Sequence, residues 1–599
     1  MLTVPFYEDE TITSFVSRLA IANFVEDVWE FCRHMGLSYR RIIDGELSEI
    51  RRVLDLAGHT SIEIGSRHVE RIDRHVQING EALSRASFHR YRLRYCPHCI
   101  EDDIKTRTGD PLCRTYGRLH WCVIHVRTCS KHHVPLLQTD ISALAGSHNI
   151  AAMIAARPSA TFQNEPQQFS PFEAYIEDRL WGRSERKSWL DRLPLFVAGK
   201  LCEMVGATKL FGKSYFAEEI SEIDWIKCAQ TGFEILSPGE DSFRDFLRSL
   251  HIDFWKQESS FGGRLLYGRL YERLAFEIDD AAYDGIRDIM RDVALSSVPF
   301  AIGAELFGPV TVRRLHSIHS ASRQYGIHAA TVRKLLVKAG LLDANQSIAT
   351  DSRTVFAAAR VDELMEDFTS SMKPAAAREY LSTGRTLWRT LARGNYVELA
   401  LASGPDVSLT PFYFKRDLDG FLDRATKCVT REFNQEAGYL TFAEAVKAAN
   451  CRFEEILDLM LGGSLKNVST NPGKMGLDAF RFDVEEIRRL TMLPDHGGLS
   501  LSDAEKRLRL ARPVLAALID QGFIEAEHAI NPVNRCLQRI VRPEVADRFA
   551  AEYVTLIAYA KERQRHFAGM KRDLTAAGIL PVITKESVGS TFYRRAELP

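Results

Sequence analysis

Four residues between positions 96 and 132 have the types and spacing of a tetrahedral metal site. Cys96 and Cys99 form a C-x-x-C pair, and Cys129 and His132 form a C-x-x-H pair. Two intervening residues let a tight turn direct both side chains of a pair at one ion, and thiolate and imidazole ligands suit Zn²⁺. Because four protein ligands leave no open coordination position, the pattern predicts a structural zinc site. The adjacent His133 is an alternative fourth ligand.

Other cysteines and histidines in this region allow two further interpretations. Cys113 and Cys122 could form a second metal site with His120 or His125, although the spacings are irregular. A zinc-containing nuclease could use the same histidines or His133, but no catalytic carboxylate or Asn partner lies at a fixed spacing. The chain contains no G-x-x-x-x-G-K-[ST], H-E-x-x-H or G-x-S-x-G motif. We therefore expect the protein not to be an enzyme.

The same region resembles the zinc-containing domain of the TniQ/TnsD family. The resemblance rests on L-R-Y-C-P-x-C, Trp121 and C-x-x-H-x-x-P-L-L, and on the opening PFYEDETITSFVSRLAIAN with Glu10, Ser14 and Arg18. The later parts of the chain match more loosely and look like the longer, DNA-binding TnsD type. The family's last pair is often C-P-x-H-G, whereas here His133 stands in place of the glycine. The family selects targets for bacterial transposons together with an AAA+ ATPase regulator.

Length and composition set limits on the class of protein. A chain of 599 residues exceeds one hydrophobic core and predicts roughly three to five domains. Its apolar content of 45% and charged content of 26% are ordinary for a folded protein. No apolar run approaches the ~20 residues of a membrane helix, so we expect no membrane partner. The acidic N-terminus lacks a signal pattern, which predicts a cytoplasmic location.

The predicted fold is mainly α and multidomain, with short strands near the zinc knuckle. Apolar residues from Ile12 to Leu19 recur at helical spacing, which predicts a first helix. Residues 88–95 alternate and predict a strand whose arginines meet phosphate or pair with the acidic run 101–103. Residues 120–127 predict a second strand, in which Trp121 packs against the knuckle. We predict a TniQ-type domain with the zinc knuckle at 1–138, a linker at 139–170, a helical domain at 171–300, two basic helix-turn-helix modules at 301–425, a third module at 426–495 and winged-helix-like modules at 496–599.

Beyond residue 300 the chain repeats one amphipathic plan five times. In each copy a shorter helix and a turn precede a helix that ends at a glycine and is followed by apolar residues. This order is typical of a helix-turn-helix unit, and the apolar residues after the glycine can begin a wing strand. The copies contain residues 332–342, 387–397, 456–465, 514–524 and 570–580.

Basic residues concentrate in several copies, although the net charge of the chain is −1. A recognition helix places its N-terminal side chains against base edges and its flanks against phosphates, so outward-facing Arg, Lys and Thr are candidates for DNA contacts. The third copy is acidic, which favours a structural or protein-contact role. The predicted DNA-binding residues are Arg323, Thr331, Arg333, Lys334, Lys338, Arg385, Arg389, Arg393, Arg507, Arg509, Lys571 and Arg572.

These patterns and the resemblance together imply a DNA-binding protein that selects a transposon's target site. Its expected partners are double-stranded DNA, an AAA+ ATPase regulator and a transposase complex, and its expected cofactor is structural Zn²⁺. One alternative is an adaptor that links an RNA-guided complex to the transposase without reading DNA, as the shorter family members do. A zinc-containing nuclease and a transcription regulator, which would usually be far shorter, are less favoured.

Overall fold

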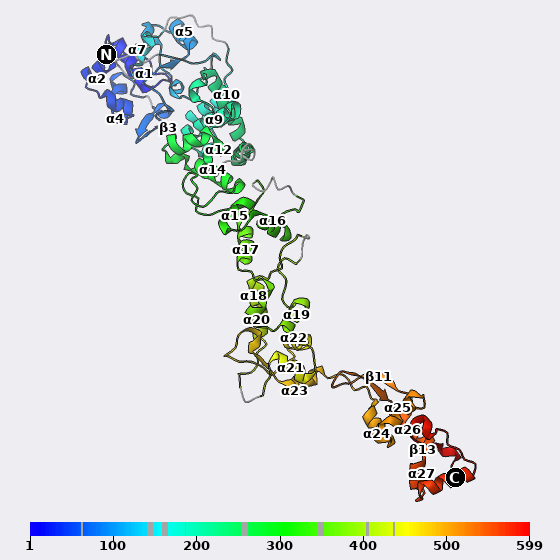
Figure 1. Ribbon diagram of the computed structural model, residues 1–599. Coiled ribbons are helices and arrows are strands. Elements are labelled where there is room, and N and C mark those ends of the chain that lie inside the picture. The colour runs from blue at the N-terminus through cyan, green and yellow to red at the C-terminus, as the bar shows by residue number, and fades with distance from the viewer. Residues whose placement is uncertain are drawn as a thin grey trace. The chain divides into compact units, whose positions relative to one another are not determined.

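The computed structural model describes residues 1–61, 64–139, 148–157, 166–185, 187–252, 262–345, 353–402, 407–434 and 438–599. The chain divides into two compact units. The first comprises Met1–Ala329 with Gln346–Asp362, and the second comprises Ala330–Asn345 with Glu363–Pro599. Both are mainly helical, with short antiparallel sheets (Figure 1). No helix among the described residues combines the length and the apolar character needed to cross a membrane.

The first unit begins with the predicted amphipathic helix. The Thr11 hydroxyl caps this helix by accepting a hydrogen bond from the Ser14 amide, and Phe15, Val16 and Leu19 are fully buried. Further short helices and a three-stranded antiparallel meander complete this part. Their bounds are α1 Ile12–Ala22, α2 Val28–His34, α3 Tyr39–Asp44, α4 Leu47–Leu56, β1 Val69–Ile72, β2 His75–Ile78 and β3 Glu81–Ser84.

The cysteine-rich region contains much less strand than its alternating pattern predicts. Within residues 88–95 only β4, Arg94–Tyr95, is a strand, and it pairs with β5, Leu137–Gln138. The predicted strand at 120–127 is wrong, because a 3-10 turn spans Leu119–Cys122 and irregular backbone follows. One buried side chain links the two segments. The Arg94 guanidinium donates hydrogen bonds to the carbonyls of Val123 (2.8 Å) and Val126 (2.6 Å). The helices here are α5 Pro97–Thr106 and α6 Pro111–Arg114.

Part of the segment predicted as a linker is a packed helix. Helix α7, Ile150–Ala155, contacts α1. Its Met153 and Ile154 are buried in the same cluster as Cys96 and Trp121. Residues 140–147 and 158–165 of that segment lie outside the described residues.

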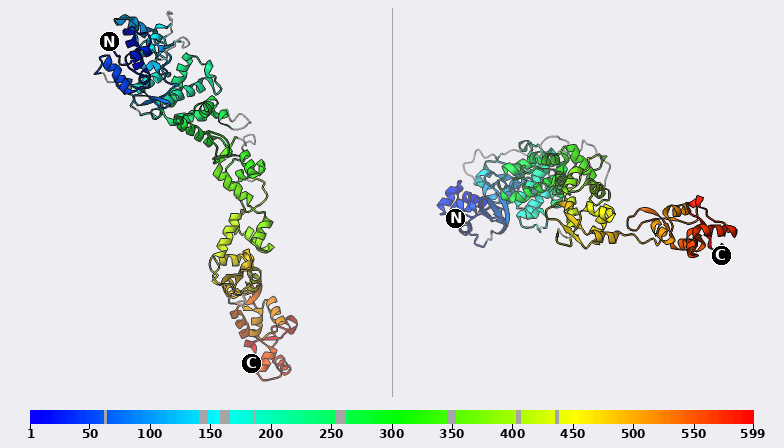
Figure 2. Two further views of the ribbon diagram at one scale, coloured as in Figure 1. Left: turned by 90° about the vertical axis from the view of Figure 1, so that its left-hand side faces the viewer. Right: turned by 60° about the horizontal axis from the view of Figure 1, so that its bottom comes forward.

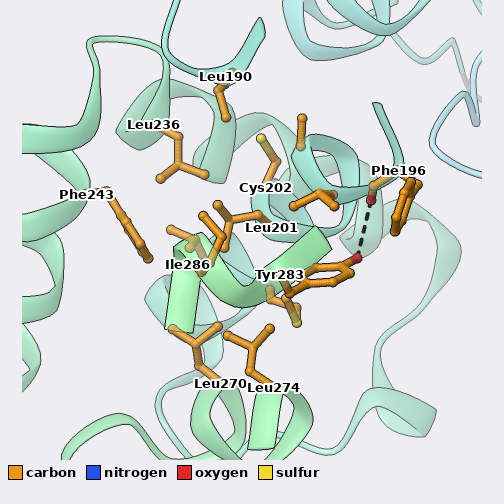
Figure 3. Close-up of a cluster of buried hydrophobic side chains, with 14 of the residues drawn as sticks. Leu190, Phe196, Leu201, Cys202, Leu236, Phe243, Leu270, Leu274, Tyr283 and Ile286 are labelled. Carbon is orange, nitrogen blue, oxygen red and sulfur yellow. Dashed lines mark hydrogen bonds between the residues drawn. The ribbon is translucent and has the colours of Figure 1, made fainter. Parts of the chain in front are cut away.

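A bundle of helices forms the next part of the first unit, which also contains α15 Ile318–Tyr325. Helices α9 and α10 touch backbone to backbone: a Cβ on Gly206 would lie 1.7 Å from the Cys228 carbonyl oxygen, so only glycine fits there. Figure 3 shows how Leu201 and Cys202 of α9 pack with Tyr283, whose hydroxyl donates to the Phe196 carbonyl at 3.5 Å. The helices are α8 Pro171–Leu180, α9 Leu195–Phe211, α10 Glu222–Leu236, α11 Glu240–Leu250, α12 Gly263–Tyr267, α13 Arg269–Glu272 and α14 Asp284–Ser297.

This bundle shares one continuous core with the N-terminal sheet. Val69, Ile78 and Leu83 of the meander lie in the same cluster as Leu201 of α9. Buried ion pairs cross the boundary, including Arg179–Glu81 at 2.6 Å. The blue N-terminal segment and the cyan-to-green bundle adjoin in both views of Figure 2. Residues 1–138 and 171–300, predicted as separate domains, therefore pack directly against each other.

Five helix pairs follow in the chain, and we call them modules 1 to 5. Each lies at one of the predicted repeats. The pairs are α15 Ile318–Tyr325 with α16 Ala329–Lys338, α18 Pro374–Tyr380 with α19 Arg385–Arg393, α21 Phe442–Ala449 with α22 Phe453–Leu461, α24 Leu501–Leu508 with α25 Arg512–Asp520, and α27 Leu556–Glu562 with α28 Phe567–Ala576. The connecting helices are α17 Ala358–Thr369, α20 Lys415–Thr426, α23 Val484–Thr491, α26 Pro543–Glu552 and α29 Lys585–Val588.

The five modules share one backbone geometry. In every module a left-handed residue in the turn lies nine positions after the N-cap of the first helix, and the second helix begins three positions later. The N-cap and turn residues are Ser317 and Gly326, Lys373 and Ser382, Thr441 and Asn450, Ser500 and Arg509, and Thr555 and Gln564. A second left-handed residue follows each second helix: Gly340, Asn395, Gly463, Gly522 and Gly578.

Each module is also framed by strands or single bridges that pair antiparallel. The frames are β6 Leu315–Ser317 with β7 Val355–Ala357, the bridge Met372–Tyr413, β8 Val468–Thr470 with β9 Phe480–Phe482 and the bridge Leu440–Phe482, β10 Leu499–Ser500 with β12 Leu537–Val541, and β13 Tyr553–Thr555 with β14 Phe592–Arg594. In module 4 a hairpin of β11 Glu527–Ile530 and β12 follows the second helix, and the sheet order is β10-β12-β11.

Candidate metal centre and nucleic-acid interface

The four predicted zinc ligands come together in one cluster. The ligand atoms of Cys96, Cys99, Cys129 and His132 all lie within 4.8 Å of one another. Cys99 Sγ is 3.7 Å from Cys129 Sγ, and His132 Nδ1 is 3.2 to 3.6 Å from the three sulfur atoms. Zn–S bonds of about 2.3 Å and Zn–N bonds of about 2.0 Å in a tetrahedron imply S···S and S···N edges of about 3.8 and 3.5 Å. The cluster therefore fits Zn²⁺.

Local structure positions each half of the cluster. Cys96 is the N-cap of α5 and Pro97 occupies the first helical position, so Cys99 falls in the first turn. Thiolates are favoured there by the helix dipole. In the second half, the His132 amide donates to Cys129 Sγ at 3.4 Å, which closes the knuckle turn. The three sulfur-bearing residues are buried and His132 is half-buried, as expected of a closed structural site.

A carboxylate outside the cluster fixes the orientation of His132. Because Nδ1 faces the sulfur atoms, Nε2 is free to donate, and it lies 3.0 Å from Asp102 Oδ2. Lys131 Nζ also donates to Asp102 Oδ2, at 2.5 Å. A carboxylate bound to the far nitrogen of a ligating histidine holds the ring and strengthens its basicity.

His133, the alternative ligand, lies outside the cluster. It is exposed and its backbone is left-handed, with φ of 54°. Its amide donates to the Cys129 carbonyl at 2.9 Å. The turn thus needs positive φ at this position, which explains why glycine suits it in the family pattern.

We predict that His133→Gly stabilises the first unit by about 0.5 kcal/mol. Glycine avoids the ~1–2 kcal/mol cost of a side chain in the left-handed conformation. Part of this gain is lost because glycine has more conformational freedom in the unfolded chain. Denaturant unfolding of the zinc-loaded chain measures the change. Ser130→Gly, in the same turn at negative φ, is the control and should destabilise the unit. Equal effects of the two substitutions would contradict the backbone explanation.

The knuckle is tied to the rest of the unit through aromatic rings and arginines. Trp121 packs in the cluster that contains Cys96, Cys99 and Cys129, which confirms its predicted position. Arg118 lies over the Trp121 ring at 4.7 Å and over the Tyr116 ring at 4.2 Å. Asp103 accepts from Arg118 at 3.0 Å. The acidic run after Cys99 is thus occupied by Arg118 and Lys131, and Arg94 donates elsewhere, to backbone carbonyls.

The three polar residues of the opening motif form a buried network. Arg18 is fully buried, and its Nη1 donates to both carboxylate oxygens of Glu10, at 2.9 and 2.8 Å. Nη1 also lies 3.0 Å from the Pro5 carbonyl, and Nε and Nη2 donate to the Cys113 carbonyl. The Ser14 hydroxyl donates to Glu10 at 2.8 Å. Arg18 therefore joins α1, the segment before it that contains Pro5, and the cysteine-rich region, which is a structural role.

Arg18→Met is expected to destabilise the first unit by about 3 kcal/mol, because it leaves Glu10 buried without its cation. The double replacement Glu10→Leu with Arg18→Met removes both charges and should recover most of that loss. Denaturant unfolding of both variants separates the cases. A double variant no more stable than the single one would show that packing of the Arg18 stem, and not the ion pair, carries the effect.

The described residues contain no second cluster of metal-ligating side chains. His125 Nδ1 bonds to Glu203 of α9 at 2.9 Å, and Arg127 donates to the same carboxylate at 2.7 Å. His120 lies against Trp121, and burial lowers its pKa to about 4. The cysteine sulfurs of Cys113 and Cys122 contact backbone carbonyls. The geometry thus does not assemble a second zinc site or a nuclease centre from these residues.

The predicted DNA-binding residues of module 1 lie on or beside its two helices. Arg323 is exposed in the last turn of α15. On α16, Lys334 is exposed and its Nζ donates to the Ser408 carbonyl at 3.1 Å, while Thr331, Arg333 and Lys338 are half-buried.

Module 2 presents the clearest basic helix face. Arg385, Arg389 and Arg393 of α19 are all exposed and are spaced by four, so they lie along one side. None forms an ion pair with another described residue. Leu387 and Leu391 on the opposite side are buried. Three guanidinium groups are thus exposed along one side of α19.

The predicted DNA-binding residues of modules 4 and 5 differ in whether they form ion pairs. In module 4, Arg507 forms a two-bond ion pair with Asp547 at 2.8 Å, and Arg509 is the exposed left-handed residue of the turn. In module 5, Lys571 and Arg572 are exposed on α28 and form no ion pair among the described residues.

The second helix of module 3 is covered by its neighbours. The Tyr396 hydroxyl of module 2 donates to Asp458 of α22 at 2.5 Å. Glu455 of α22 accepts two hydrogen bonds, at 2.8 and 2.6 Å, from Arg535 at the hairpin tip of module 4. Modules 2 and 3 also share one hydrophobic core. The acidic residues of α22 thus serve contacts between modules, a role that their charge suggested in the sequence.

Equivalent positions separate the modules into two groups. The fifth and sixth residues of the second helix are Arg333 and Lys334 in module 1, Arg389 and Thr390 in module 2, Leu457 and Asp458 in module 3, Ala516 and Ala517 in module 4, and Lys571 and Arg572 in module 5. The sequence alone did not reveal these two groups of modules, because the copies were compared by the glycine that ends each one and not by the start of the second helix. Modules 1, 2 and 5 are basic there, and modules 3 and 4 are not.

Comparison with known proteins assigns the N-terminal part. No curated protein matches the chain. Residues 1–136 match the TniQ family model, a stretch that contains the opening motif, the buried Glu10–Arg18 network and all four residues of the cysteine and histidine cluster. The match covers less than a quarter of the chain and supports the TniQ family for this part, and the TniQ domain is associated with target selection in transposition.

Proposed function

We propose that the protein selects the target site of a bacterial transposon by binding a specific double-stranded DNA sequence. In this proposal the C-terminal modules read DNA, and the TniQ domain engages an AAA+ ATPase regulator that recruits the transposase. The protein itself performs no strand chemistry. This is the TnsD-like role that the long C-terminal half favours.

The observation that carries the proposal is the repeated pair of helices joined by a left-handed turn, with basic second helices in modules 1, 2 and 5. A second helix lying in the major groove directs its outward side chains to base edges and phosphates. Arginine and lysine at the equivalent positions suit both contacts, whereas leucine, alanine and aspartate in modules 3 and 4 do not. We propose that modules 1, 2 and 5 bind DNA and that modules 3 and 4 set the distance between them, with the module 4 hairpin as a wing held against module 3.

Zinc has a structural part in this account. Bound by Cys96, Cys99, Cys129 and His132, Zn²⁺ would cross-link α5 to the knuckle turn and so fix the core around Trp121. The closed ligand set leaves no position for substrate or water. Zinc would then stabilise the surface that meets the ATPase, although the metal itself would not be part of that surface.

Crosslinking tests which modules meet DNA. The zinc-loaded full chain is irradiated with host genomic fragments, and the crosslinked peptides are identified by mass spectrometry. Crosslinks are expected in the peptides that contain α16, α19 and α28 and should be absent from α22. Crosslinks confined to residues 1–300, or a complete lack of them, would contradict direct reading and favour an adaptor positioned by another complex.

A further inference from the structure

Four of the ten residues that line a small pocket in the first unit are arginines. It encloses about 170 Å³ between α3, the meander and the segment that follows it. Arg40, Arg71, Arg85 and Arg90 line it, and Asp44 is its one lining carboxylate. Neither the zinc cluster nor the C-terminal modules use this pocket.

The guanidinium of Arg90 is buried there without a counterion, and it contacts the Phe88 ring, whose centroid lies 5.6 Å away. Arg90 is only 8% exposed, its Nη1 is sealed from solvent, and it makes no hydrogen bond or ion pair with a described residue. Burial lowers the pKa of Arg90. A buried cation without a counterion is costly, and structures retain one where a ligand supplies the missing charge.

The charges around Arg90 do not compensate it. Asp44 pairs with Arg40 at 3.0 Å and with Arg71 at 3.4 Å, so one carboxylate serves two arginines. Arg85 is exposed and forms no ion pair with a described residue. His148, which also lines the pocket, has a buried Nδ1 without a partner, and burial lowers its pKa to about 4. Four guanidinium groups therefore face one carboxylate and a neutral imidazole.

We propose that this pocket binds a phosphate group. Guanidinium groups bind phosphate through paired, charge-assisted hydrogen bonds, and several arginines around one small cavity match its multiple oxygens. The cavity has room for a phosphate and a few waters, since a water occupies about 30 Å³, but it is smaller than the ~300 Å³ or more of pockets that enclose a whole organic ligand. The phosphate belongs to a nucleic-acid backbone or is a free inorganic ion. The inference does not depend on DNA reading by the modules.

Protection of arginines from a dicarbonyl reagent tests the proposal residue by residue. The full chain is treated with the reagent in inorganic phosphate or in chloride of equal ionic strength, and modification is mapped by mass spectrometry. Phosphate should slow modification of Arg85 at least threefold and leave Arg92 unchanged. Arg92 is the matched control, because it is exposed and close in the chain but does not line the pocket. Equal behaviour of the two arginines would overturn the proposal.

Two variants and a second probe complete the test. Arg90→Met should abolish protection of Arg85 and raise the melting temperature of the first unit, because it removes an uncompensated buried charge. Arg40→Ala, an exposed change, should weaken protection, whereas Arg92→Ala should not. Random-sequence duplex DNA replaces inorganic phosphate in a parallel experiment. If the duplex protects Arg85 at a lower phosphate concentration than the free ion does, the bound phosphate belongs to nucleic acid. If only inorganic phosphate protects, the ligand is the free ion. Protection that persists in Arg90→Met would overturn the site.

Discussion

Replacing Arg385, Arg389 and Arg393 together by alanine is expected to lower the affinity for the selected DNA about a thousandfold at 0.15 M salt, since each guanidinium in contact with DNA contributes roughly 1–3 kcal/mol and a thousandfold is about 4 kcal/mol. The three side chains are exposed on one face of α19 and engage no described carboxylate, so their loss leaves the fold of module 2 intact. Alanine also favours the helix.

The same variant should change the salt dependence of binding. Each arginine that no longer neutralises a phosphate reduces the slope of log affinity against log salt by about 0.9, so the slope should fall by up to about 3. The control replaces Lys427, Lys466 and Lys474, three exposed cations of the same region that lie outside the second helices. It makes the same change in net charge. If the control weakens binding as much as the α19 variant, the effect is one of overall charge and α19 is not a reading helix.

Cys96→Ser is expected to remove bound zinc and unfold the first unit, because structural zinc contributes about 10–16 kcal/mol to folding, whereas whole domains are stable by only about 5–15 kcal/mol. Metal analysis should fall from one zinc per chain to none, and the melting transition of the first unit should be lost. The second unit has its own cores and should melt as before. A chelator should reproduce the result on the unaltered chain.

Cys122→Ser is the matched control for the metal site. Cys122 lies in the same region, but its sulfur contacts the Arg118 carbonyl and is not part of the cluster. This variant should keep one zinc and a near-normal melting temperature. A Cys96→Ser chain that retains full zinc and full stability would refute the ligand assignment.

Features that depend on short spacing were predictable from the sequence. The C-x-x-C and C-x-x-H pairs predict a cluster that the structure assembles, because each pair is closed by a local turn. The helix pairs beyond residue 300 follow from apolar spacing and helix-ending glycines in the same way. The geometry of the turn was hidden, because non-glycine residues such as Ser382, Asn450 and Arg509 hold its left-handed position. In module 2 the residue after the second helix that is left-handed is Asn395, not Gly394.

Features that depend on distant partners were not predictable. The alternation at 88–95 indicated a strand with three arginines on one face, but Arg94 is buried against carbonyls some thirty residues later in the chain. Burial of Arg90 likewise depends on α3 and β1, which no local pattern reveals. His125 meets Glu203 across a segment that the sequence suggested to be a linker. In each case the pattern within a short segment carried no information about the surface against which it folds.

Selection from a random duplex library and host genomic fragments, with the zinc-loaded full chain at near-physiological salt, tests the central claim most directly. We predict recovery of one long sequence motif, with a footprint of several helical turns in which protected stretches alternate with an unprotected stretch opposite modules 3 and 4. Weak, salt-sensitive binding without enrichment of any sequence would contradict the claim. The helix pairs would then be protein-binding surfaces of an adaptor.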